Sequence, residues 1–468
     1  NDLPIVVTAL ALWKIGAVFV GMSRAIPTTG KTDLIAQSGA ELLIGDSRTV
    51  GELSPLRSTM PELRRIVQVD DVSGQDEWEG LVDGGDAAFR ADIDPLALGA
   101  IAYTSGTTGS PKGVMHSQHG LLLPAAVTAH RGSVTPEDPV IVVNPLTTLN
   151  ILITNALVAF AAVSKCVLTD RHDAASIAAQ IERERAACMS TVPTIYYDLL
   201  ADEQVLPSQL ASMTKPRVGG APMSEAMKDL FASRFGGRPS TSYALTEAPA
   251  WVSRQEAGDD AADGTCGRPL PHIKVVILDE EGRAVEPGVP GEICFGPHTT
   301  GEWAGVYRPM LGYLSRPDES AEALRDGLFH SGDVGMLDEQ GELFLLERRS
   351  QMIIRGGSNI FPSEIERVLI DDDDVRLACV VPRPDERLGE VVVAFVEPVQ
   401  GRTIETAALY DRCRRDLAAY KVPSEIHVVT EMPLTPLGKV NRSQVHQLLS
   451  DARFSVDDQR ASSTTGHD

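Results

Sequence analysis

One run of hydroxyl-bearing and glycine residues, closed by a lysine, constrains this chain more than any other stretch. The run is Thr104-Ser-Gly-Thr-Thr-Gly-Ser-Pro-Lys-Gly113. It follows an apolar segment, residues 98–103, that predicts a buried strand. Beyond it, Ser117 is a typical cap for a helix that begins near Gln118. The sequence therefore predicts a ligand-binding loop between a strand and a helix.

A loop of this composition can bind phosphate oxygen atoms. Glycines let backbone N–H groups approach an anion closely, hydroxyl groups donate hydrogen bonds, and a lysine adds positive charge. It is not a Walker loop, because Lys112 follows a proline and precedes Gly113. The alternative is a polar surface turn, which needs fewer such residues in a row. The candidate phosphate-binding residues are Thr104, Ser105, Gly106, Thr107, Thr108, Gly109 and Lys112.

Composition excludes several classes of function. The chain has 468 residues, enough for two or three domains, and its net charge of −23 argues against a nucleic-acid or anionic-membrane partner. Its six cysteines form no C-x-x-C pair, which favours free thiols in a reducing, cytoplasmic compartment over disulfides or a zinc site. Residues 9–22 and 151–163 are apolar but too short and too interrupted to span a membrane. No signal peptide is visible, and the start at Asn1 reads as the interior of a domain, so we expect an N-terminally incomplete chain.

The order of helical and strand-like runs predicts the fold. Alternating runs in the first 100 residues indicate parallel α/β layers, with ligands at the carboxyl ends of strands. Short β elements between 274 and 313 indicate a β subdomain, and the segment after Glu366 reads as a compact α+β unit. We predict an α/β protein with a large N-terminal domain of layered α/β subdomains plus a β subdomain, and a small, mobile α+β C-terminal domain. The expected bounds are 1–346 for the large domain, 347–350 for a hinge, 351–450 for the small domain and 451–468 for a disordered tail.

Further motifs follow the loop in a fixed order. They are Ser242-Tyr-Ala-Leu-Thr-Glu247, Phe329-His-Ser-Gly-Asp-Val-Gly335, the run from Gly341 to Glu366, and Pro433-Leu-Thr-Pro-Leu-Gly-Lys-Val-Asn-Arg442. Together with the loop, they resemble the signature of the adenylate-forming superfamily, which includes acyl- and aryl-CoA synthetases, luciferases and peptide-synthetase adenylation domains. The resemblance covers essentially the whole chain.

The resemblance implies a nucleotide site. Tyr243 would stack on adenine, Thr246 would contact the α-phosphate, and Glu247 would hold Mg²⁺, a role that suits a single carboxylate. Asp333 would accept both ribose hydroxyls, and Arg348 would contact ribose or phosphate. Lys439 would be the catalytic lysine. Residues lining the adenine and acyl sites would be Gly219, Gly220, Ala221, Thr148, Val192 and Ala244, and Gly356 with Gly357 would let the pantetheine arm of CoA pass.

The chain departs from the family pattern at several positions. Ala244 replaces a glycine, Glu347 replaces Asp or Gly, and Ser350 stands where a charged hinge residue is usual. Thr147 and Thr148 replace an aromatic residue and His, so a helix start with threonine caps competes with a pocket role there. Ser363 and Glu366 have the spacing of a capping box, which favours a structural role for both.

The implied activity is ATP-dependent activation of a carboxylic acid followed by thioester formation with CoA. Domain rotation would bring Lys439 and then Gly356 to the site in turn. Residues 145–165 contain no carboxylate to hold an ammonium group, so a neutral acyl or aryl tail is expected, and we predict a medium- or long-chain fatty acid. The alternatives are an aryl-acid CoA ligase, an adenylating enzyme that loads a carrier protein, and a non-catalytic nucleotide-binding module. ATP, Mg²⁺ and CoA are the expected cofactors and co-substrates.

Overall fold

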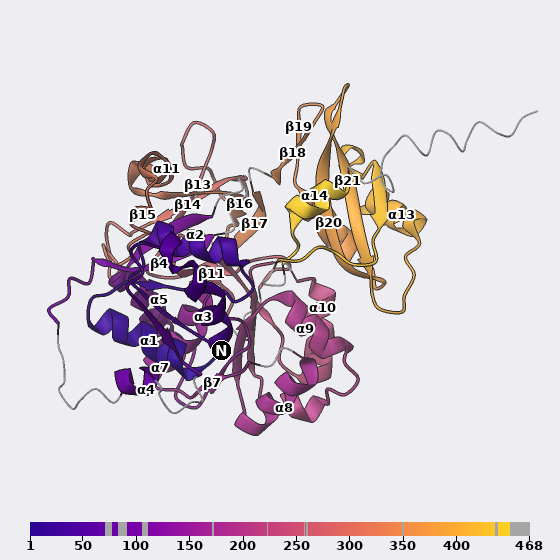
Figure 1. Ribbon diagram of the computed structural model, residues 1–468. Helices are drawn as coiled ribbons and strands as arrows, with labels where there is room; N and C mark the ends of the chain where they lie inside the picture. Colours follow the sequence, from indigo (N-terminus) through magenta and orange to yellow (C-terminus); the bar gives the residue numbers. More distant parts are fainter. Residues whose placement is uncertain are drawn as a thin grey trace, which may run out of the picture.

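The computed structural model describes residues 1–70, 77–82, 91–104, 111–170, 173–221, 223–256, 258, 261–348, 351–435 and 439–449. Figure 1 shows a large N-terminal body with a smaller C-terminal domain, drawn in orange and yellow, beside it. The predicted α/β class and the two-domain arrangement are confirmed. None of the helices in the described residues is long and apolar enough to cross a membrane.

The main sheet of the large domain is seven-stranded in the described residues. Its central strands run parallel, and two antiparallel strands extend one edge. Because the central strands are parallel, their carboxyl ends lie at the same end of the sheet, where a ligand site is expected. In spatial order the strands are β12 (Arg268–Pro269), β11 (Ala250–Arg254), β10 (Ser240–Leu245), β9 (Lys215–Gly219), β8 (Cys188–Thr191), β6 (Val140–Val142) and β7 (Cys166–Leu168).

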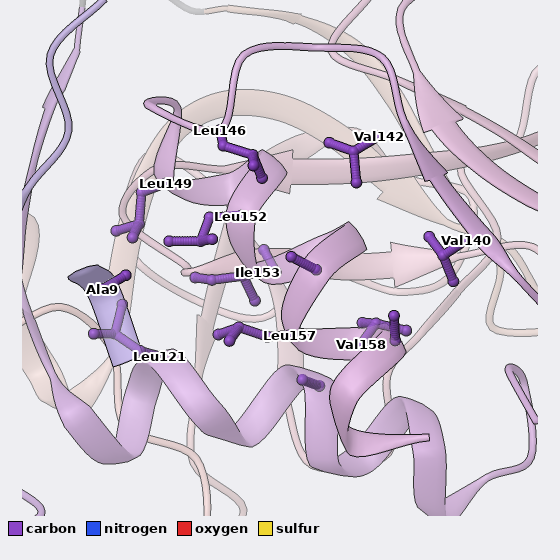
Figure 2. Close-up of a cluster of buried hydrophobic side chains, with 14 of the residues drawn as sticks. Ala9, Leu121, Val140, Val142, Leu146, Leu149, Leu152, Ile153, Leu157 and Val158 are labelled. Atoms are coloured by element: carbon purple, nitrogen blue, oxygen red, sulfur yellow. The ribbon is translucent and has the colours of Figure 1, made fainter. Parts of the chain in front are cut away.

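Helices cover both faces of this sheet, because its strands are apolar on both sides. One face packs on buried side chains of α8 (Ala174–Glu184), α9 (Pro193–Ala201) and α10 (Glu225–Phe235). The other packs on α1 (Leu3–Lys14), α5 (Gln118–His130), α6 (Leu149–Ile151), a π-helical turn over Leu152–Leu157, and α7 (Val158–Ala161). Figure 2 shows this second core, where Leu149, Leu152 and Leu157 face Leu121 and Ala9.

The strands on either side of the predicted phosphate loop pair with each other, which the sequence did not predict. Strand β4 (Leu98–Thr104) pairs antiparallel with β5 (Lys112–Ser117), and Thr104 lies opposite Lys112. Ser117 then caps α5, and its Oγ accepts the Gly120 N–H at 3.1 Å, as predicted. The flanking strands are β1 (Phe19–Val20) and β15 (Gly312–Tyr313). The expectation that Gly312 and Tyr313 belong to the β subdomain is therefore wrong, because they pair with β5.

A four-stranded antiparallel sheet forms the β subdomain in the described residues. Its order is β13 (Lys274–Leu278), β14 (Gly291–Gly296), β16 (Phe329–Leu337) and β17 (Leu343–Arg348). Helix α11 (Pro317–Ala323) precedes β16. The first hundred residues add α2 (Thr28–Ser38), α3 (Ser47–Leu53), α4 (Glu77–Val82) and the parallel pair β2 (Leu42–Gly45) and β3 (Arg65–Gln68).

The small domain is a sheet with helices packed on it. Its strands are β18 (Ile353–Arg355), β19 (Ser358–Ile360), β20 (Val375–Asp385), β21 (Gly389–Pro398) and β22 (Glu425–Val428), and its helices are α12 (Pro362–Ile370), α13 (Thr406–Asp416) and α14 (Arg442–Leu448). Apolar side chains from these elements form two buried clusters. The expected tail, 451–468, lies outside the described residues.

The predicted capping box in this domain is wrong. The N-cap of α12 is Phe361, without a side-chain hydrogen bond. The Glu366 carboxylate instead accepts the Val380 N–H at 2.7 Å and pairs with Arg442 at 2.7 Å. A buried carboxylate is stabilised more by a cation than by an N-terminal N–H, which explains the difference.

Candidate active site

A buried carboxylate, a tyrosine and an arginine meet where the main sheet adjoins the β subdomain. Asp333 lies on β16, directly opposite Arg348 on β17. The Tyr243 hydroxyl donates to Asp333 Oδ2 at 2.6 Å, and Arg348 Nε lies 3.1 Å from Asp333 Oδ1. Burial raises the pKa of Asp333, although the positive charge of Arg348 opposes that shift. Three residues predicted to bind the nucleotide, from three strands, are thus brought together.

Lys439 from the small domain lies against the large domain. A Cβ placed on Gly220 would be 2.8 Å from Lys439 Cε and 3.0 Å from Lys439 Nζ, and 3.8 Å from Val192 Cγ1. Gly220 has φ +79°, so both its backbone conformation and its neighbours favour glycine. Burial, followed by the charge of Arg348, lowers the pKa of Lys439. The loop of Lys439 is closed by the Thr435 N–H, which donates to the Lys439 carbonyl at 2.6 Å.

The candidate phosphate and metal groups are joined by Tyr313. Its hydroxyl donates to Glu247 Oε1 at 3.1 Å, and Lys112 Nζ lies 5.1 Å from the centre of its ring. Lys112 Nζ also pairs with Glu319 Oε2 at 2.5 Å. Lys112 and Glu247, the predicted metal ligand, therefore both contact the side chain of Tyr313.

Side chains from other elements form hydrogen bonds to the turn that carries Thr246 and Glu247. Asn150 Nδ2 donates to the Leu245 carbonyl at 3.1 Å, and Asn150 Oδ1 accepts the Ala250 N–H at 3.3 Å. His116 Nε2 lies 2.8 Å from the Thr246 carbonyl, and burial lowers the pKa of His116 to about 4, so the ring is neutral and donates. Both contacts position the backbone of the turn between β10 and β11.

The remaining predicted residues lie at several places. Ser105, Gly106, Thr107, Thr108, Gly109 and the hinge residue Ser350 fall outside the described residues. Gly219 ends β9, where a Cβ would lie 2.9 Å from Ser242 Oγ, and Ala221 follows it partly buried. Gly356 and Gly357 form the turn of the β18–β19 hairpin with φ of +58° and +83°.

The predicted acyl-pocket residues flank the site and the core. Val192 is buried beside Gly220, and Ala244 packs against the core cluster of Figure 2. Thr148 is the N-cap of α6 but makes no side-chain capping bond. The predicted helix start with Thr148 at its N-cap is therefore confirmed without a side-chain capping bond, and the pocket role stays a prediction.

Four positioning residues were missed from the sequence: Tyr313, Glu319, His116 and Asn150. Each acts across more than 60 residues of chain or through a backbone carbonyl, so no local pattern marks it. The sequence around Gly312-Tyr313 indicates only a short β element. The six cysteines are free, as predicted, and all but the partly buried Cys166 are buried.

The structure brings Lys112 and Glu247 to Tyr313, joins Asp333 to Tyr243 and Arg348, and places Lys439 of the second domain against Gly220. Residues 1–302 match the model of the AMP-binding enzyme family, and residues 364–439 match the AMP-binding enzyme C-terminal domain. The chain belongs to the AMP-binding enzyme family, as the motif resemblance predicted.

Similar proteins indicate which class of AMP-binding enzyme this chain is. The chain is 31% identical over 461 residues to an indoleacetate–CoA ligase of Aromatoleum aromaticum, covering 97% of this chain and 88% of the relative. It is 29% identical over 373 residues to a long-chain-fatty-acid–CoA ligase of Escherichia coli, covering 79% of this chain and 64% of the relative. The crystal structure of an anthranilate CoA ligase in complex with anthranoyl-AMP superposes with a TM-score of 0.87 at 22% identity, over 96% of this chain and 85% of that one. The protein is an AMP-forming acid–CoA ligase.

Proposed function

We propose that the protein joins a carboxylic acid with a neutral tail to CoA through an acyl adenylate, with Lys439 acting in the first step. The observation that carries this proposal is the position of Lys439, which reaches from the small domain to Gly220 in the large one. Gly220 follows directly on β9, at the ligand-binding edge of the sheet.

A carboxylate is a poor acylating agent, because its leaving group would be oxide. In the first step a carboxylate oxygen forms a bond to the α-phosphorus of ATP, and the bond to the β-phosphate oxygen breaks, releasing pyrophosphate. Such chemistry depends on positioning and charge stabilisation rather than on a protein nucleophile. Lys439 would stabilise the charge that develops at the α-phosphate, and Lys112 would hold the departing pyrophosphate. One such donor contributes about 3–4 kcal/mol in other enzymes.

Glu247 fits the Mg²⁺ ion that this family implies. Tyr313 occupies Oε1 only, and a hard dication that bridges phosphates needs few protein carboxylates. When bound, the ion would neutralise phosphate charge. Asp333 would meanwhile accept ribose hydroxyls, with Arg348 and Tyr243 fixing its two oxygens in place.

In the second step the thiol of CoA loses its proton, sulfur attacks the acyl carbon, and the bond to AMP breaks. Lys439 fills the space beside Gly220, so we propose that the small domain rotates about residues 347–350 between the steps and brings Gly356 and Gly357 to the site. Both glycines lie in the exposed turn of the β18–β19 hairpin. Because they have no side chains, the pantetheine arm could approach their backbone closely.

For the acid we propose a ring-bearing or aliphatic carboxylic acid without a second charge. The segment over residues 145–165 is largely buried and apolar, with Leu146, Leu149 and Leu152 in the core. The indoleacetate–CoA ligase aligns over more of the chain than the fatty-acid ligase does, so ring-bearing acids are the first candidates and medium- or long-chain fatty acids the second. AMP release measured over a panel of both kinds of acid, with and without CoA, ranks them. Acceptance of a carrier protein in place of CoA would contradict the proposal.

The role of Lys439 is tested by the substitution Lys439→Ala. Exchange between ATP and pyrophosphate should fall at least about a hundredfold, since one stabilising charge is lost, whereas thioester formation from supplied acyl adenylate should stay within a few fold. Lys421→Ala is the matched control, because Lys421 belongs to the same domain but pairs with Glu364 at 2.6 Å. Equal loss of both half-reactions in Lys439→Ala would refute the assignment.

A further inference from the structure

Three metal-binding side chains lie together on the β subdomain, apart from the nucleotide cluster. Glu292 and Cys294 are two residues apart on β14, so their side chains share one face, and Cys294 lies opposite His330 on β16. A carboxylate oxygen, the thiol sulfur and His330 Nδ1 all lie within 4.8 Å of one another. In the part of the chain that the structure describes, no other trio of His, Cys, Asp or Glu side chains has this spacing.

The spacing of the three atoms suits a tetrahedral ion. His330 Nδ1 is 3.3 Å from Cys294 Sγ and 3.2 Å from Glu292 Oε2. Zinc bonds of about 2.3 Å to sulfur and about 2.0–2.1 Å to nitrogen or oxygen place such ligand atoms roughly 3.3–3.6 Å apart. Two of the three separations therefore already suit one ion, and the third, between Cys294 Sγ and a Glu292 oxygen, is at most 4.8 Å. The three side chains lie on the two central strands of the sheet, β14 and β16.

Hydrogen bonds alone leave this trio poorly satisfied. A protonated Nδ1 can donate to Glu292 but then offers nothing to the Cys294 thiol, and an unprotonated Nδ1 turns its lone pair toward the carboxylate. Nε2 of His330 is buried and has no hydrogen-bond partner among the described residues, so no contact there selects the tautomer. A cation at the centre would accept an electron pair from all three atoms at once.

The surroundings orient the carboxylate and balance the charge. Glu292 Oε1 accepts the Gly332 N–H at 3.1 Å, which directs Oε2 toward His330. A thiolate and a carboxylate neutralise a divalent ion. Arg325 lies 3.5 Å from Oε2, but its side chain is 43% exposed and can turn into solvent. The Glu292 side chain is 15% exposed and gives the ion a path to Cys294, which is fully buried.

We propose that Glu292, Cys294 and His330 bind one thiophilic divalent cation, of which Zn²⁺ is the best match, in a site with three protein ligands. On binding, the Cys294 S–H bond breaks, its proton passes to solvent, and sulfur donates an electron pair to the metal, while bound waters leave the ion. A water molecule would fill the fourth coordination position of the ion. Gly332, held by Glu292, directly precedes Asp333, so the ion would stiffen the strand that presents the ribose carboxylate. This inference does not depend on the proposed function.

The test is a titration of the full, metal-stripped chain with Co²⁺. We expect thiolate-to-cobalt charge-transfer absorption that saturates at one ion per chain, is abolished by added Zn²⁺ and is unaffected by Mg²⁺. Cys294→Ser should abolish the band. The matched control is Cys266→Ser, which changes another buried thiol in the same domain and should leave the band unchanged.

Two further measurements keep the proposal testable if Cys294→Ser folds poorly. His330→Gln should weaken Co²⁺ binding about tenfold or more, since loss of a metal's supporting groups alone costs that much. Zn²⁺ should raise the melting temperature of the unaltered chain by a few degrees and that of His330→Gln by less at the same concentration. Asp333→Asn should bind Co²⁺ normally, because it lies outside the trio. A folded chain without the charge-transfer band, or a band that survives Cys294→Ser, would overturn the proposal.

Discussion

At the scale of single residues, the candidate site depends on groups whose surroundings change their acidity. Asp333 is 2% exposed, and burial raises its pKa even though Arg348 is beside it. The pKa of Lys439 is lowered, because burial and the charge of Arg348 both disfavour its ammonium form. Each shift opposes the charged form on which the proposed chemistry depends, so each has a measurable consequence.

Asp333→Asn should weaken ATP binding. The substitution keeps the size of the side chain but removes the charge that faces Arg348, and a hydrogen bond to a charged group contributes about 1.5–3 kcal/mol, equivalent to about a tenfold or larger rise in the KM for ATP. Steady-state kinetics at saturating acid measures it. Asp318→Asn, an exposed carboxylate in the first turn of α11, should leave KM unchanged.

The pH dependence of adenylate formation should report Lys439. An ordinary lysine loses its charge near pH ~10.4, and the lowered pKa of Lys439 moves that loss to lower pH. The exchange rate should therefore decline on the alkaline side before an ordinary lysine titrates, because the charged form is the active one. Lys439→Arg, if it retains activity, should extend the plateau to higher pH. An alkaline limb that is identical in both proteins would assign the titration to another group.

At the scale of elements, the turn between β10 and β11 is positioned by a helix that is not its neighbour in sequence. Asn150, in α6, bonds to the backbone on both sides of Thr246 and Glu247. Ala250, which ends this turn, has φ +89°, an unfavourable conformation for a residue with a side chain. The two hydrogen bonds help to hold that conformation in place.

Asn150→Ala should therefore impair activity more than stability. Loss of the two bonds should cost about 1–3 kcal/mol of unfolding free energy, and the freed turn should lower the exchange rate about tenfold or more. Asn155→Ala is the comparison, because Asn155 bonds to Ser190 from the same segment and lies away from the turn. It should lose similar stability but keep its exchange rate. Equal activity in the two variants would contradict the positioning role of Asn150.

At the scale of the whole molecule, the two domains also touch at places other than Lys439 and Gly220. Arg376 on β20 lies 5.4 Å from the ring of Tyr197 on α9, and Arg367 Nη1 would be 3.3 Å from a Cβ on Gly264. The hydrogen bond from the Ser363 N–H to Glu347 Oε2, at 2.8 Å, joins the first turn of α12 to the end of β17. Tyr197 and Arg376 both line a groove of about 670 Å³ that has residues of both domains along it.

Arg376→Ala should loosen the orientation in which Lys439 meets Gly220. A cation–π contact of this kind contributes about 0.5–1 kcal/mol, which corresponds to a two- to fivefold loss of exchange rate, with thioester formation from supplied adenylate unchanged or faster. Arg402→Ala serves as the control. Arg402 lines the same groove and, like Arg376 with Glu397 at 2.5 Å, forms an ion pair within the small domain, with Asp374 at 3.4 Å. Of the two arginines, Arg376 is the one that contacts Tyr197 of the large domain. A loss that is equal in both half-reactions would point to a general loss of stability instead.

Much of this protein was determined by its sequence alone. The alternation of strands and helices and the cap at Ser117 follow from local patterns, because propensity and capping are properties of neighbouring residues. Tyr243, Asp333, Arg348 and Lys439 are site candidates through the resemblance of their motifs to those of a known family. The elements that deviated are the short ones. Strand β5 was missed because six residues of mixed polarity carry no clear period, and β15 was assigned to the wrong sheet because pairing partners are chosen in space.

Only the tertiary structure decided how distant side chains combine. It placed Lys439 against Gly220, and it brought Glu247 and Lys112 into contact with Tyr313. It paired Glu366 with Arg442, where the sequence predicted a capping box. It also set Glu292 and Cys294 beside His330, although the spacing of the cysteines had argued against a metal site. The physical reason is the same in each case: burial makes an unpaired charge or polar group costly, so its partner is selected by proximity in the fold and not by distance along the chain.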